Sequence, residues 1–104
     1  MLLKALVTLV VAALLEVGGD AVIRMGLSGP RLLIAAGGLV LFAYGVLVNK
    51  SGIDFNRMMG VYIAVFFLVS QLIAWIVFKQ VPDDRLLVGG GFIVAGGLLI
   101  LVMT

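Results

Sequence analysis

Four apolar runs, each long enough for a membrane-spanning helix of about 20 residues, divide the chain. They predict four transmembrane helices in a chain of 104 residues, at positions 2–25, 32–48, 58–78 and 86–103. The short segments between them are rich in Gly, Ser, Asn, Pro and charged residues, which is typical of turns. Consecutive helices should therefore run antiparallel, within a single four-helix transmembrane domain that covers residues 1–104.

The composition fits a membrane environment and excludes a water-soluble fold. Residues of types A, V, I, L, M, F, W, Y and C make up 64% of the chain, and another 14 residues are glycine. Charged residues make up only 12%, which is too few to cover a globule of this size with solvated side chains. Residues 61–69 and 98–102 lack the alternation that a β-barrel strand needs, so the predicted fold class is an all-α membrane protein.

The missing residue types exclude several classes of function. The chain has no histidine and no cysteine, so it lacks the main ligands of zinc sites, the residues that form disulfides and the histidine of the usual catalytic triads. The seven Lys and Arg residues are scattered singly and do not form the basic patch of a nucleic-acid-binding protein. We therefore expect no enzyme activity, metal, cofactor or nucleic-acid partner.

The start of the first run resembles a secretory signal, because Lys4 precedes a series of apolar residues. Glu16 interrupts this series, and no clear cleavage context follows it. We expect the segment to be retained as the first helix, since its removal would leave a three-helix remnant.

Basic residues near helix ends set the orientation of a membrane protein, and here they are almost evenly divided between the two sides. One side holds three and the other holds four: Lys4, Lys50 and Arg57 against Arg24, Arg31, Lys79 and Arg85. The balance predicts dual topology, in which copies insert both ways and pair as an antiparallel homodimer around a shared cavity. The alternative is a fixed orientation with a balance that arises by chance. A single four-helix unit has little interior for a solute, which also favours an oligomer.

Glu16 is the main candidate for a functional residue. It lies about 20 Å of helix rise beyond Leu3, past the middle of the bilayer. An acid at that depth is unfavourable by about 2.5–3.5 kcal/mol, and such residues commonly bind protons or cations. Asp20 and Arg24 follow at four-residue spacing on the same face, so they are predicted to form a structural ion pair. Asp20 is also a candidate for the proton and substrate site.

Glu16 has an alternative structural role, as a protonated acid that is hydrogen-bonded across a helix interface. Gly18 and Gly19 leave bare backbone beside it, which either admits a substrate or lets another helix approach closely.

The third run carries aromatic and polar residues at four-residue spacing, which places them on two helix faces. These residues are Tyr62, Phe66 and Ser70 on one face, and Phe67, Gln71 and Trp75 on the other. Aromatic rings near an acid suit a lipophilic cation, so Tyr62, Ser70 and Trp75 are candidates for the proton and substrate site. The alternative is a packed core or an interfacial belt, which also uses aromatic residues.

The fourth run is rich in glycine and predicts a close helix contact. Its small residues include Gly90, Gly91, Ala95 and Gly97. We favour a contact between two copies of the chain, and the alternative is packing within one copy.

Several short motifs resemble those of a known family. The motifs are Glu16-Val17-Gly18-Gly19, Tyr44-Gly45, Asp54-Phe55-Asn56-Arg57, and then Tyr62, Ser70, Trp75 and Pro82-Asp83 with the glycines of the fourth run. With these motifs the chain is similar to the small multidrug resistance superfamily, and most closely to its YnfA-type branch, across nearly its full length.

The resemblance implies a proton-coupled exporter of cationic, hydrophobic compounds that works as an antiparallel dimer. It implies that Glu16 binds protons and substrate in turn, and that Tyr62 contacts the substrate. Met59 stands where the family has an aromatic residue, and Asp20 replaces a small neutral one. These departures favour smaller or more polar cations.

We therefore predict an efflux antiporter in a bacterial-type cytoplasmic (inner) membrane, which exchanges protons for small cationic or lipophilic-cation compounds. Its partners would be that substrate, protons, membrane lipid and a second copy of the chain. One alternative is a non-transporting membrane assembly or regulatory protein. The other is one subunit of a heteromeric lipid-carrier or metabolite transporter.

Overall fold

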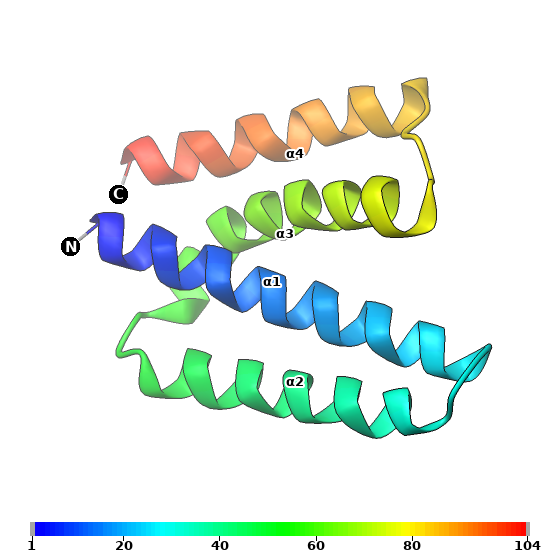
Figure 1. Ribbon diagram of the computed structural model, residues 1–104. Helices are drawn as coiled ribbons and strands as arrows, with labels where there is room; N and C mark the ends of the chain where they lie inside the picture. The colour runs from blue at the N-terminus through cyan, green and yellow to red at the C-terminus, as the bar shows by residue number, and fades with distance from the viewer. Residues whose placement is uncertain (1, 104) are drawn as a thin grey trace. The chain divides into compact units, whose positions relative to one another are not determined.

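The computed structural model describes residues 2–103 and consists of helices joined by short loops (Figure 1). The helices are α1 (Leu2–Leu27), α2 (Leu32–Lys50), α3 (Phe55–Phe78) and α4 (Asp84–Met103). All four are long and apolar enough to cross a membrane. The predicted all-α fold with four candidate membrane spans is therefore confirmed. The predicted dual-topology dimer and the single domain over residues 1–104 stay predictions.

Each of the four helices extends two or three residues beyond one of its predicted bounds. α1 continues past Met25 through Gly26 to Leu27, before the Ser-Gly-Pro turn. α2 runs through Asn49 to Lys50 instead of ending at Val48. α3 begins at Phe55, where the Met58 amide donates to the Asp54 carbonyl at 3.1 Å. α4 begins at Asp84 because the Asp83 carboxylate accepts the Leu86 amide at 2.9 Å, as an N-cap does.

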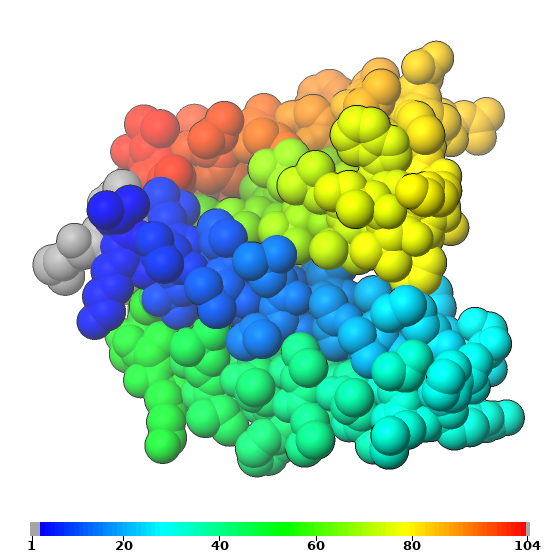
Figure 2. Space-filling model, viewed as in Figure 1, coloured from blue at the N-terminus to red at the C-terminus, as the bar shows by residue number. Residues whose placement is uncertain are grey.

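The chain forms two compact units, one up to Ile53 and the other from Asp54 onward. In the first unit α1 and α2 run antiparallel and lie against each other along their length (Figures 1 and 2). Glycines permit this close approach: a Cβ added at Gly37 would lie 2.6 Å from the Gly19 carbonyl oxygen. A Cβ at Gly26 would lie 2.7 Å from the Ile34 amide nitrogen. The backbones of α1 and α2 are therefore in near contact at these points.

In the second unit α3 and α4 also form an antiparallel hairpin (Figure 1). Gly97 of α4 faces Ala64 and the Gly60 carbonyl of α3, and a Cβ added at Gly97 would collide with the Ala64 methyl group. Gly90 lies under the ring of Phe67 in the same way. Two of the glycines in the fourth run thus pack within one copy of the chain.

Candidate functional site

Glu16 lies near the middle of α1, about 21 Å of helix rise from Leu2. Its side chain is half-buried. The residues before it are apolar for about two turns, from Leu9 to Leu15. A carboxyl group is therefore held within a helix whose length and hydropathy suit a membrane span.

The acidic face of α1 is not its exposed apolar face. At about 100° per residue, Glu16 and Asp20 fall within about 60° of the buried residues Leu9 and Ala13. Three exposed apolar side chains of the same part of α1 lie on the opposite side of the helix: Val7, Val11 and Leu14. If the exposed apolar face meets lipid, Glu16 is directed away from lipid.

Asp20 and Arg24 occupy the end of α1, in more open surroundings than Glu16. Arg24 Nη2 lies 3.9 Å from Asp20 Oδ2, and the two side chains are 57% and 69% exposed, respectively. Arg24 is also in the last turn of α1, where the carbonyl ends of the helix favour a positive charge. The geometry is that of a loose ion pair near a helix end, and the roles assigned to both residues stay predictions.

The two glycines after Glu16 have different surroundings. Gly19 is buried and faces Leu41 and Gly37 of α2, so it belongs to the contact between the two helices. A Cβ added at Gly18 would meet no atom within 4 Å. The open backbone beside Glu16 is therefore at Gly18.

The structure does not bring the three site candidates of α3 together within one chain. Tyr62 is buried, and its ring centroid lies 5.0 Å from that of Phe55 and 6.0 Å from that of Phe66. The Ser70 hydroxyl donates to the Phe67 carbonyl at 2.8 Å. Trp75 is 55% exposed and lies about 20 Å of helix rise beyond Tyr62. Their predicted contacts with a substrate stay predictions.

The small residues of α4 lie on different faces of the helix. Gly90 and Gly97 are buried against α3, as described above. Gly91 and Ala95 are exposed, and a Cβ added at Gly91 would meet no atom within 4 Å. The face with Gly91 and Ala95 is therefore not covered by α3, and neither are Gly89 and Gly96, where an added Cβ would also meet no atom within 4 Å.

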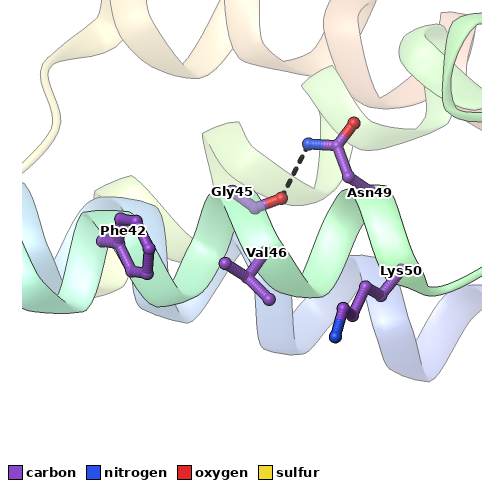
Figure 3. Close-up of a pocket in the computed structure, with 5 residues that line it drawn as sticks. All are labelled: Phe42, Gly45, Val46, Asn49 and Lys50. Carbon is purple, nitrogen blue, oxygen red and sulfur yellow. Dashed lines mark hydrogen bonds between the residues drawn. The ribbon is translucent and has the colours of Figure 1, made fainter.

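Two surface cavities have volumes of about 400 Å³ each, and sequence reasoning found neither. One lies along α2 and is lined by Phe42, Gly45, Val46, Asn49 and Lys50 (Figure 3). In it the Asn49 amide turns back and donates to the Gly45 carbonyl at 2.7 Å. The other lies at the end of α3 and is lined by Trp75, Ile76, Lys79 and Val81. The sequence signal for both is an aromatic residue followed by a lysine near a helix end.

Metal chemistry has no support in the described part of the chain. Residues 2–103 contain no group of three or more His, Cys, Asp or Glu side chains that could hold a metal ion. The predicted absence of a metal site stays a prediction for the whole protein.

The four apolar helices define a small membrane protein, and the half-buried carboxyl group midway along α1 is its candidate ion site. The chain belongs to the UPF0060 membrane protein family, in agreement with the YnfA-type resemblance of its motifs. Relatives from Staphylococcus aureus strains MRSA252 and JH9 are each 33% identical to it over 96 residues, with 89% of both chains covered. Both are described only as UPF0060 membrane proteins. No protein-family model and no solved structure matches the chain.

Proposed function

We propose that this protein is a proton-coupled secondary transporter of the small multidrug resistance type, and not an enzyme. It would exchange protons for small cationic compounds across a bacterial cytoplasmic membrane. Two chains in opposite orientations would enclose one cavity, with the Glu16 carboxyl groups as its binding site.

The observation that carries this proposal is the position of Glu16. It lies midway along α1, half-buried, on the side of the helix opposite to the exposed Val7, Val11 and Leu14. A carboxyl group inside a membrane is unfavourable as a free charge, so it favours either a bound proton or a bound cation. The Glu16 carboxyl group is therefore suited to bind a proton and a cation, one at a time.

Exclusive occupancy is what would couple the two flows. If a cation binds only after the proton leaves, each ligand lowers the affinity for the other by the same factor. A gradient of protons then drives cations in the opposite direction, provided that the cavity opens to one side at a time. No covalent chemistry and no cofactor are required.

Dimer formation is supported by the size of the chain and by its charges. Four helices have little room to enclose a solute, whereas two copies could surround a cavity. The open face of α4, with Gly91 and Ala95, offers a surface on which helices can approach closely. The near balance of basic residues permits the two orientations that such a pair requires.

The proposal is tested by proton release from the detergent-solubilised protein. Quaternary ammonium, guanidinium and polyamine cations are added to weakly buffered samples of the wild type and of Glu16→Gln, and the pH change is recorded. We expect saturable release from the wild type and none from Glu16→Gln. Asp84→Asn is the matched control, because Asp84 is an exposed acid at the start of α4; it should release protons as the wild type does.

Two results would reject the transporter. If no cation releases protons although Glu16 titrates, the site does not couple the two ligands, and an assembly role or a missing partner chain explains the acid better. If Glu16→Gln releases as many protons as the wild type, the protons come from other groups. A hydrogen-bonding role for Glu16 would also leave the glutamine variant fully stable and assembled.

A further inference from the structure

The cavity at the end of α3 combines apolar and cationic groups at the point where a membrane span ends. Its lining consists of Trp75, Ile76, Lys79 and Val81, and its volume is about 400 Å³. Trp75, Ile76 and Val81 are 55%, 64% and 74% exposed, so their apolar surfaces are open to the surroundings. Such exposed apolar side chains next to a lysine are suited to an amphipathic ligand.

The backbone fixes the position of Lys79. Lys79 follows the last residue of α3, Phe78, and adopts a left-handed conformation with φ of 58°. Its amide donates to the Ala74 carbonyl, and the Gln80 amide donates to the same carbonyl at 2.9 Å. These bonds close the helix with a turn, after which Lys79 lines the same cavity as Trp75 and Ile76, one turn earlier in α3.

The ammonium group of Lys79 forms no ion pair with the described residues. Among residues 2–103, no carboxylate lies within ion-pair distance of its ammonium group. The nearest acids in the sequence serve α4 instead: the Asp83 carboxylate accepts the Leu86 amide, and Asp84 lies in the first turn, where the helix favours a negative charge. Lys79 therefore presents a positive charge that an external anion can meet.

The residues that line the cavity favour one class of anion over another. Tryptophan and lysine at the end of a span are the residues that lie at the level of lipid headgroups. A headgroup phosphate at Lys79 would leave the glycerol and first acyl carbons against Trp75 and Ile76, whereas a free soluble anion would leave those apolar surfaces uncovered. Charge and apolar surface together fit an anionic phospholipid better than a small soluble anion.

We propose that this cavity is a binding site for the headgroup of an anionic phospholipid. Lys79 binds the phosphate group, and Trp75, Ile76 and Val81 contact the glycerol and the beginning of the acyl chains. The proposal uses no residue of α1 and does not depend on the transport proposal.

Trp75 makes this proposal directly measurable, because it is the only tryptophan of the chain. The full-length protein is reconstituted into phosphatidylcholine vesicles that contain increasing fractions of phosphatidylglycerol with brominated acyl chains, which quench tryptophan fluorescence on contact. A parallel series uses brominated phosphatidylcholine. We expect the anionic lipid to bind at Trp75 roughly fivefold more tightly, the factor that one lysine contributes at a charged membrane surface.

Three variants identify the group responsible. Lys79→Gln should abolish the preference for the anionic lipid, whereas Lys79→Arg should retain it because the charge remains. Lys50→Gln is the matched control, since Lys50 also lies at a helix end and lines the other cavity, whose lining contains no tryptophan; it should keep the preference. Quenching that is equal for both lipids in the wild type would overturn the proposal, and so would a preference that persists in Lys79→Gln.

Discussion

The two acids of α1 lie one helical turn apart, but their surroundings differ. Glu16 is half-buried in the middle of the helix, whereas Asp20 is 69% exposed and lies 3.9 Å from Arg24. An exposed ion pair contributes at most about 1 kcal/mol to stability, because solvent screens it and both side chains lose freedom. The structure thus supports different roles for the two acids, and the main role of Asp20 is the ion pair with Arg24 near the helix end.

This difference predicts the behaviour of Asp20→Asn. We expect the variant to release as many protons per chain as the wild type, with the half-saturating cation concentration changed by less than about fivefold, which corresponds to about 1 kcal/mol. Its free energy of unfolding should fall by no more than about 1 kcal/mol. Proton release and thermal unfolding in detergent check both expectations. A variant that releases fewer protons would show that Asp20 is a second proton site.

At the scale of the helices, the contact between α1 and α2 depends on Gly37. A Cβ at this position would lie 2.6 Å from the Gly19 carbonyl oxygen, so Gly37→Ala forces the helices apart and should lower the free energy of unfolding by about 1–3 kcal/mol. The neighbouring Gly38→Ala is the matched control, because its Cβ would meet nothing within 4 Å. It should stabilise α2 by about 0.5–1 kcal/mol through helix propensity. Thermal unfolding followed by circular dichroism distinguishes the two, and equal effects would contradict the observed helix contact.

The two faces of α4 predict two different defects. Gly97→Leu places a large side chain against Ala64 and should destabilise the α3–α4 hairpin by more than about 1 kcal/mol. Gly91→Leu adds the same side chain on the open face, so it should not lower the free energy of unfolding of the hairpin, and it should weaken association between chains. Light scattering of the detergent complex measures the association. A fully dimeric Gly91→Leu would exclude this face of α4 as the contact.

The sequence predicts the helices better than their ends and their contacts. Long apolar runs are sufficient for the four helices, but that criterion stops at polar residues, and so it missed a start such as Asp84, which depends on the Asp83 N-cap. Glycine spacing predicts that α4 makes close contacts, yet it does not say that Gly97 faces α3 while Gly91 faces outward. That choice depends on the rotation of α4 about its own axis, which only the packing against α3 determines. The cavity beside Lys79 depends in the same way on the turn after α3.

At the scale of the whole molecule, the proposed function requires two orientations of the same chain. A homodimer whose subunits are antiparallel can present the same site to either side of the membrane, because exchanging the two subunits' conformations reverses the opening. Each subunit must then insert both ways at comparable frequency. The nearly even distribution of basic residues is the property of this chain that would allow it.

Variants whose basic residues are shifted to one side of the membrane should therefore insert in one orientation only and lose export. One variant carries Ser28→Lys and Gln80→Lys, which add positive charge to the side that holds Arg24, Arg31, Lys79 and Arg85. The other variant carries Asn49→Lys, Asn56→Lys and Arg31→Gln, which shift the balance of positive charge to the opposite side. The four residues that are replaced by lysine are exposed. Reporter fusions should show both orientations for the wild type and one for each variant, because basic loops stay cytoplasmic. Cells that express either variant alone should not export a cation found by proton release, whereas cells that express both should. Export by a single-orientation variant would exclude the antiparallel dimer and leave a parallel assembly or another partner chain.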